Sequence, residues 1–569
     1  MKRLRDILHA RLRIGAFLLL GLTLGGCGWL GEDAATPAAV ASAHPLATQA
    51  GMQILSSGGN AFDAAVAVTA VLAVVGPHGS GLGGGGFWLL HRASDGLQVM
   101  IDGRERAPLA ATRDMYLDDS GEVVDGLSIN GALAAAIPGE PAALVHLAER
   151  YGTLPISHTL APAIRIAREG FETNAQYNRL AQFRLVDMQN DPETARLFLQ
   201  DDDIPEPGYL IRQPELAATL EAISLHGRSG FYHGEVAEKL VEGVRQAGGI
   251  WSLEDLESYR VVERTPHSGS YNGMRVVSAS LPSSGGVVLQ TMLNILAGFP
   301  LDTMDEATRT HVIIEAMRRA YRDRAEHLGD PDFHVAPVAE LVSTAHADRL
   351  RETIRLDRAT PYPVTGSEAA AAGGMHTTHF SILDSEGTRV AATLSVNYPF
   401  GACFTPPGTG VLLNNEMDDF SAKPGVPNLY GLVGSGANAI APGKRPLSSM
   451  SPTFVESEEG VAILGTPGGS RIITMVLLGI LDMAEGKLPD AWVSRQRFHH
   501  QYLPDVVQYE SDAFDVDLAE TLQEMGHTLK ALDSTYGNMQ AILHEPKTGK
   551  VYAASDPRGV GMSAVSVRD

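Results

Sequence analysis

The chain has 569 residues, of which 44% are hydrophobic and 20% charged, and its mean hydropathy is −0.02. These values describe a soluble globular protein with a large core, either of more than one domain or of one unusually long layered domain. The formal net charge of −23 excludes nucleic-acid binding, because phosphate backbones would be repelled, and the two cysteines exclude a disulfide framework.

A basic leader opens the chain and predicts export. Its apolar run ends at Leu24 and is shorter than the roughly 20 residues of a membrane span. Two glycines and Cys27 follow, as in a bacterial lipobox, although an ordinary signal peptide with a chance cysteine is the alternative. We expect a lipoprotein-type signal peptide over residues 1–26 and a lipidated Cys27. The lipid would anchor the protein at the periplasmic face of a bacterial membrane, with the outer membrane as one candidate.

The segment after the leader is rich in Ala, Pro and Thr and predicts a tether over residues 27–48. Helical patterns follow at 50–55 and 61–75, and the second is apolar nearly all round, which predicts a buried helix. Asn60 can cap this helix, with Asp63 three positions later as an approximate capping box.

A glycine run, Gly79 to Gly86, contains a G-x-G-x-x-G match. Dinucleotide binding would require a strand before this motif and a helix after it. Here the helix precedes and a strand-like run, 87–90, follows. We therefore interpret the run as a turn that lets backbones approach closely.

Helical patterns and strand-like runs then mix without strict βαβ alternation. Helical patterns dominate at 141–168 and 305–328, and strand-like runs lie at 97–102, 274–278, 379–384, 389–396, 461–464 and 541–544. This mixture favours stacked α and β layers, an α+β fold.

A Pro-, Gly- and Ala-rich linker over residues 359–376 cannot bury enough apolar surface to order itself. It meets a strand-like run directly at Thr377. Two strand-like runs, 378–384 and 388–396, are joined by Ser-Glu-Gly, a common hairpin loop with Gly last. This hairpin predicts that Thr377 faces Ser395, with Asn397 two residues further on the same face. On pattern alone, two exposed hydroxyls at a sheet edge are the alternative.

The motifs of this chain resemble those of the γ-glutamyltransferase (γ-glutamyltranspeptidase, glutathione hydrolase) family of N-terminal-nucleophile hydrolases. The resemblance runs from about residue 47 to the end of the chain. Besides Thr377-Thr378-His379-Phe380-Ser381, the shared motifs lie at 58–61, 82–87, 102–105, 282–286, 328–332, 413–420, 445–453, 467–471, 498–501 and 555–558.

This resemblance implies a four-layer αββα sandwich formed by two subunits of one precursor. The precursor would cut itself between His376 and Thr377 into a large subunit, 49–376, and a small catalytic subunit, 377–569, which pair as a heterodimer. Thr377 would then be nucleophile and, through its freed α-amine, base. Ser395 would orient it, and the amides of Gly468 and Gly469 would stabilise the oxyanion.

The resemblance also implies how a γ-glutamyl group is held. Its α-carboxylate would bind Arg104, with Ser448 and Ser449 as neutral donors. Asn397, Glu416 and Asp419 would accept hydrogen bonds from its α-ammonium. Tyr430 would be the gate of a lid over residues 420–432. Without the resemblance, the arginine would be interpreted as a surface ion-pair residue and Pro-Gly-Gly as an ordinary turn.

The implied substrates are glutathione and other γ-glutamyl compounds, with amino acids, peptides or water as acceptors and with no cofactor. We assign no metal, because His499 and His500 lack a Cys or acidic partner at ligand spacing. Two alternatives stay within the superfamily: a cephalosporin or glutaryl acylase, and a polyglutamate transferase. A third is a non-catalytic surface lipoprotein, which would not split into two fragments.

Overall fold

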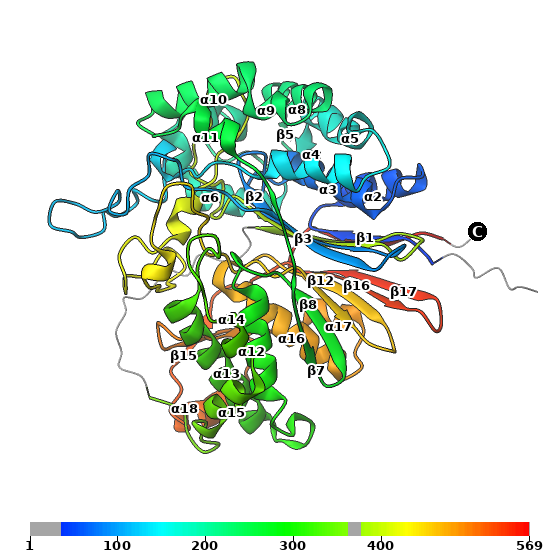
Figure 1. Ribbon diagram of the computed structural model, residues 1–569, viewed down its shortest axis with the longest axis vertical. Helices are drawn as coiled ribbons and strands as arrows, with labels where there is room; N and C mark the ends of the chain where they lie inside the picture. Colours follow the sequence, from blue (N-terminus) through cyan, green and yellow to red (C-terminus); the bar gives the residue numbers. More distant parts are fainter. Residues whose placement is uncertain (1–35, 362–376, 568–569) are drawn as a thin grey trace, which may run out of the picture. The chain divides into compact units, whose positions relative to one another are not determined.

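The computed structural model describes residues 36–361 and 377–567, and residues from Pro37 onward form one unit. Within these residues two antiparallel sheets lie face to face (Figure 1). The first has the strand order β18 (Met562–Val565), β1 (Ala39–Ser42), β9 (Thr378–Leu383), β10 (Arg389–Ser395), β2 (Gly85–Arg92), β3 (Leu97–Gly103) and β6 (Val262–Arg264). The second has the order β17 (Lys550–Ser555), β16 (Gln540–Glu545), β12 (Val461–Gly465), β11 (Thr453–Glu456), β8 (Met274–Ser278) and β7 (His267–Tyr271).

Helices cover the outer face of each sheet. Over the first sheet lie α2 (Pro45–Ser56), α3 (Ala61–Val75), α4 (Glu140–Arg150), α5 (Ile156–Glu169) and α8 (Pro214–His226). Over the second lie α12 (Gly285–Leu296), α13 (Glu306–His327) and α16 (Ile472–Ala484). The periphery adds α6 (Ala175–Gln189), α7 (Pro192–Phe198), α9 (Ser229–Tyr232), α10 (Gly234–Gln246), α11 (Leu253–Ser258), α14 (Val338–Leu341), α15 (Thr344–Glu352), α17 (Pro489–Ser494) and α18 (Val516–Glu524), and short strands at 171–172, 210–211, 498–499, 507–510 and 529–532. The expected four-layer αββα sandwich is confirmed.

The layer between the sheets is largely apolar, and a few polar contacts cross it. Ala391 and Leu89 of the first sheet pack in one cluster with Phe454 and Ile463 of the second. Ser381 donates its hydroxyl across the gap, 3.2 Å from the carbonyl oxygen of Ile463. Because the sheets are joined by packed side chains, the strand ends on both keep fixed positions relative to each other.

Helix α3 shows why the first helical layer forms. All of its residues are buried, as its apolar composition predicts. Asn60 accepts hydrogen bonds from the amides of Phe62 and Asp63, and Asp63 accepts one from the amide of Asn60. The predicted capping box is therefore confirmed.

The expectation of a tether is wrong for the second half of that segment. Ala39–Ser42 is the fully buried strand β1, which pairs with β18 on one side and with β9 on the other. The helix α2 then begins at Pro45. The small residues of this strand fit a crowded position between two neighbours, so a composition that resembles a linker here belongs to the core.

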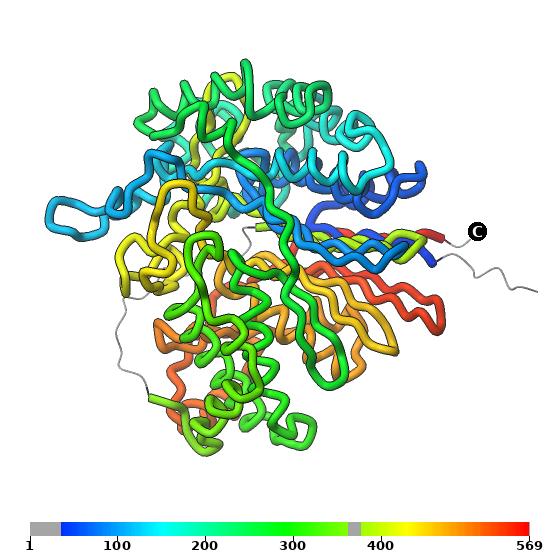
Figure 2. The backbone as a smooth tube through the Cα atoms, in the orientation of Figure 1, coloured from blue at the N-terminus to red at the C-terminus, as the bar shows by residue number. Residues whose placement is uncertain are grey.

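The parts of the chain before and after the linker are interleaved. Figure 2 shows β1 from the start of the chain, β9 from the middle and β18 from its end running side by side in one sheet. Separately, within residues 36–361 and 377–567, no helix combines the length and apolarity needed to cross a membrane. Cys27 and His376 lie outside the described residues.

Candidate active site

The hairpin β9–β10 brings two hydroxyls together at the end of the linker. Its register pairs Thr378 with Leu394, as predicted, so that Thr377 comes opposite Ser395. The Oγ1 atom of Thr377 lies 3.0 Å from the Oγ atom of Ser395, and both side chains are buried. The alternative of exposed hydroxyls at a sheet edge is thus wrong, because β1 and β2 flank the hairpin on both sides.

The backbone of Thr377 is strained. Its φ is +89°, a value that β-branched residues rarely adopt, because the side chain crowds the backbone. Such a conformation costs about 1–3 kcal/mol and tends to occur at functional sites. Ser395 is fixed from the other side: its Oγ accepts a hydrogen bond of 2.8 Å from the amide of Asn397.

The glycine run packs directly behind this pair. A Cβ atom on Gly84 would lie 2.1 Å from the carbonyl oxygen of Ser395, and one on Gly83 would lie 2.0 Å from that of Leu412. Only glycine leaves room for these backbones. Helix α3 precedes the run and β2 follows it, so the interpretation as a close-packed turn is confirmed.

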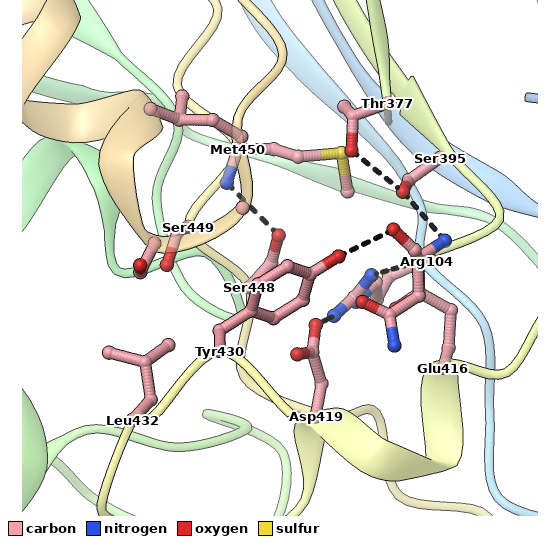
Figure 3. Close-up of a pocket in the computed structure, with 14 residues that line it drawn as sticks. Arg104, Thr377, Ser395, Glu416, Asp419, Tyr430, Leu432, Ser448, Ser449 and Met450 are labelled. Carbon is pink, nitrogen blue, oxygen red and sulfur yellow. Dashed lines mark hydrogen bonds and ion pairs between the residues drawn. The ribbon is translucent and has the colours of Figure 1, made fainter. Parts of the chain in front are cut away.

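Arg104 forms the charged floor of the site. It follows β3 and is buried, with one terminal nitrogen 2.5 Å from Asp419 and the other 2.8 Å from Glu416. Figure 3 shows the carboxylate of Asp419 turned toward the guanidinium. Burial alone would lower the pKa of Arg104, but these carboxylates raise it. Burial also raises the pKa of Glu416, although Arg104 opposes that rise.

Tyr430 covers the site. Its hydroxyl donates a 2.6 Å hydrogen bond to the carbonyl oxygen of Asn397, and its ring lies so close to Gly469 that a Cβ there would be 2.6 Å from the ring. Gln501 fixes the backbone at Tyr430, because its side-chain amide donates to the carbonyl oxygen of Tyr430 at 3.0 Å. Gln501 was one of the shared motif residues but had no predicted role.

One cavity, with only about 20 Å³ of free volume in this closed arrangement, joins these groups. It is lined by ten of the residues implied by the resemblance, namely Arg104, Thr377, Ser395, Asn397, Glu416, Asp419, Tyr430, Ser448, Ser449 and Gly469. Gly468 is not part of this lining, although it precedes Gly469 at the start of a 3₁₀ turn. The other four lining residues, Leu432, Met450, Ser470 and Ile472, had no predicted role, although Met450 and Ser470 lie in shared motifs and Leu432 ends the expected lid.

The histidine pair is part of a hydrogen-bonded network. Burial lowers the pKa of His499 to about 3, and its ring nitrogens contact Thr474 and Gln501. His500 lies 3.0 Å from Asp505, an acidic partner that the sequence did not reveal. In the described ranges, no three His, Cys, Asp or Glu side chains are grouped so that they could hold a metal ion.

Comparison with known proteins places this geometry in context. The family model for gamma-glutamyltranspeptidase matches residues 47–566. The glutathione hydrolase proenzyme of Escherichia coli K12 is 42% identical over 92% of this chain and 90% of its own length. The cephalosporin acylase of Bacillus halodurans superposes with a TM-score of 0.81 at 28% identity, over 93% of this chain and 96% of its own. The gamma-glutamyltranspeptidase of Helicobacter pylori has a TM-score of 0.55 at 39% identity, over 56% of this chain and 92% of the chain compared.

Proposed function

This chain belongs to the γ-glutamyltranspeptidase family, and from that premise we propose that it hydrolyses or transfers the γ-glutamyl group of glutathione and related compounds. The Escherichia coli relative is named a glutathione hydrolase proenzyme, which supports both the activity and self-cleavage. The observation that carries the proposal is the single cavity in which Thr377 meets the ion pair of Arg104 and Asp419.

Self-cleavage would begin at Thr377. Its hydroxyl attacks the carbonyl carbon of residue 376, the peptide C–N bond breaks, and an ester forms. Water then splits the ester into a carboxylate at His376 and the hydroxyl of Thr377. The positive φ of Thr377 supports this step, because cleavage of the peptide bond before Thr377 lets its strained backbone relax. The large subunit would end at His376 and the small subunit would begin at Thr377.

The two subunits would remain paired after the cut. β9 and β10 of the small subunit lie between β1 and β2, which both precede the cut, with ladder hydrogen bonds on both sides. In the second sheet, β11 pairs with β8 across the same division. Separation would expose the apolar inner faces of both sheets, so a stable heterodimer follows.

Catalysis would use the same hydroxyl. The α-amine freed at Thr377 titrates near 7.7–8.0 and accepts the hydroxyl proton as the oxygen attacks the γ-carbonyl. The amides of Gly468 and Gly469 would stabilise the oxyanion. The amine product leaves with the proton, and the acyl ester is then taken by water or by an acceptor amine. Ser395 would orient the attacking oxygen.

Recognition would rest on giving the charges of Arg104 and Asp419 new partners on the substrate. Arg104 contacts Asp419 directly, and a γ-glutamyl group carries an α-carboxylate for the arginine and an α-ammonium for the acid. Ser448 and Ser449 would assist at the carboxylate, and Asn397 and Glu416 at the ammonium. Until the substrate's own two charges bind, the ion pairs with Glu416 and Asp419 would compensate the buried charge of Arg104.

An acylase of the same superfamily is the alternative, given the likeness to a cephalosporin acylase. A glutaryl group has no ammonium, so it would leave Asp419 without a counter-charge from the substrate. The acid therefore favours γ-glutamyl substrates. Turnover of a γ-glutamyl anilide against a glutaryl anilide separates the two, and preference for glutaryl would reverse the assignment.

Export is also proposed rather than observed. The leader and Cys27 support a lipoprotein held at the periplasmic face of a bacterial membrane, and both lie outside the described residues. A soluble mature protein that begins elsewhere would contradict this anchor.

A further inference from the structure

Arg324 is a buried cation that lies behind the two serines of the cavity. It belongs to α13 and is 5% exposed. Across the described part of the chain its guanidinium contacts two hydroxyl oxygens and forms no ion pair. A buried charge without a counter-ion is costly, so its retention points to a task at the site it faces.

Hydrogen-bond direction shows what Arg324 does to Ser449. A guanidinium can only donate, and one of its terminal nitrogens lies 3.2 Å from the Oγ atom of Ser449. That oxygen therefore accepts, and its own hydrogen must point elsewhere. Because Ser449 lines the cavity, the hydroxyl is left to donate toward a ligand.

Through Ser284, Arg324 also holds the backbone of the neighbouring serine, Ser448. The Nε atom of Arg324 donates to the Oγ atom of Ser284 at 3.0 Å, and Ser284 donates its hydroxyl to the carbonyl oxygen of Ser448 at 2.7 Å. The Oγ atom of Ser448 accepts from the amide of Met450 at 3.1 Å, as Figure 3 shows. The Oγ atom of Ser449 is thus occupied by Arg324 and that of Ser448 by a backbone amide, which leaves both hydroxyl hydrogens available to donate in the cavity that the serines line.

The two buried arginines of the site differ in their ion pairs. Arg104, the cation that lines the cavity, is already ion-paired with both Glu416 and Asp419, so its charge is largely neutralised. Arg324 has no such partner in the described chain, and it stays charged despite burial. Ser449 therefore accepts from a cation that forms no ion pair within the described residues, although the more distant Asp419 favours its charge.

We infer that Arg324 is a positioning residue that fixes the hydroxyl of Ser449 as a donor and, through Ser284, holds the backbone of Ser448, so that the site selects ligands carrying a carboxylate at the end remote from Thr377. The inference rests on the proposed γ-glutamyl function and names the part of the site that reads the carboxylate. It predicts that loss of Arg324 weakens carboxylate binding while leaving ammonium binding in place.

The test is calorimetric binding of three acids to the mature enzyme. L-Glutamate has both remote charges, glutarate keeps only the remote carboxylate, and 4-aminobutyrate keeps only the remote ammonium. For Arg324→Met we expect affinity for glutamate and glutarate to fall roughly tenfold, as for the loss of one to two net hydrogen bonds. Affinity for 4-aminobutyrate should change less than twofold. Arg324→Lys, which keeps a buried cation, should restore part of the loss.

Two controls keep the result interpretable. Arg319→Met removes another buried arginine of α13, one that contacts Glu315 and Thr353 rather than a serine of the site, and it should lower the melting temperature without changing the ratio of the three affinities. Ser449→Ala should give no further loss of glutarate affinity when added to Arg324→Met.

Each outcome has a distinct meaning. Equal weakening of all three acids in Arg324→Met would show a structural role and overturn this inference alone. This inference alone would also be overturned if Arg324→Met did not mature and Arg324→Lys bound all three acids as the wild type does. Wild-type enzyme that binds neither glutamate nor glutarate would overturn the proposed function, and this inference with it.

Discussion

The Oγ1 atom of Thr377 and the Oγ atom of Ser395 lie 3.0 Å apart at the open end of one hairpin. Ser395 accepts from the amide of Asn397 and can donate its own hydrogen to Thr377. Such a bond holds the threonine oxygen in one orientation, both for the cut that frees its amine and for attack on the substrate.

Self-cleavage depends on the hydroxyl of Thr377. Purified wild-type protein should contain a fragment that begins at Thr377, whereas Thr377→Ala should remain one chain and be inactive, because it has no oxygen to attack the preceding carbonyl. Denaturing electrophoresis with N-terminal sequencing checks this. A pure Thr377→Ala protein that still splits before residue 377 would contradict the assignment of Thr377 as the group that cuts the chain.

Loss of the hydroxyl at Ser395 should slow both reactions. In Ser395→Ala the threonine oxygen loses its hydrogen-bond partner, so we expect kcat and the rate of self-cleavage to fall roughly three- to tenfold. Ser395→Thr keeps the hydroxyl and should stay close to wild type. Unchanged rates in Ser395→Ala, measured with a γ-glutamyl anilide and by the time course of the cut, would exclude an orienting role.

The charged floor should govern substrate choice without governing maturation. Truncating one partner of a buried charge pair costs roughly 2–5 kcal/mol, a loss of about thirty- to several-thousand-fold in kcat/KM. Arg104→Ala and Asp419→Ala should therefore lose γ-glutamyl turnover and still mature into two subunits. Asp419→Ala should damage turnover of a γ-glutamyl anilide far more than that of a glutaryl anilide. Equal losses would make the aspartate structural and strengthen the acylase alternative.

The lid should depend on one hydroxyl. In Tyr430→Phe the ring still covers Gly469, but the buried carbonyl oxygen of Asn397 loses its donor, at a cost of about 1–3 kcal/mol. We expect KM for γ-glutamyl compounds to rise roughly tenfold as the lid opens more often. Tyr177→Phe is the matched control, because its buried hydroxyl donates to the carbonyl of Phe198 in another part of the fold. A similar rise in that control would point to a general loss of packing.

The anchor is tested at Cys27. Cys27→Ser should release the protein from membranes or leave its leader uncleaved, because a serine cannot take the thioether-linked lipid, and kcat on a γ-glutamyl anilide should not change. Membrane fractionation measures release from the membrane, and the mass of the mature N-terminus shows whether the leader is cleaved. The anchor is refuted by wild-type protein that is soluble and begins at another residue.

The sequence predicted local structure well where the pattern was short-range. The hairpin register followed from a three-residue loop between two strand-like runs, and it correctly set Thr377 opposite Ser395. The buried helix α3 followed from its apolar composition and its cap. These features depend on neighbours in sequence, which is why one sequence suffices for them.

Long-range partners could not be predicted in this way. The composition of residues 27–48 predicts a tether and not β1, because the partners of β1, β9 and β18, lie more than 300 residues away and the sequence Ala-Val-Ala-Ser does not identify them. Direct contact between Arg104 and Asp419 likewise depends on tertiary packing, as does the hold of Gln501 on the lid. Such contacts become visible only when the layers are assembled.

The account's central claim is that Thr377 carries the γ-glutamyl group after freeing its own amine. Mass spectrometry of enzyme quenched during turnover of glutathione tests cleavage, nucleophile and substrate together. We expect a fragment that begins at Thr377 and is heavier by one γ-glutamyl group, with the added mass located on Thr377 by fragmentation. An active enzyme whose chain is uncut, or whose γ-glutamyl group is attached to another residue, would contradict the account.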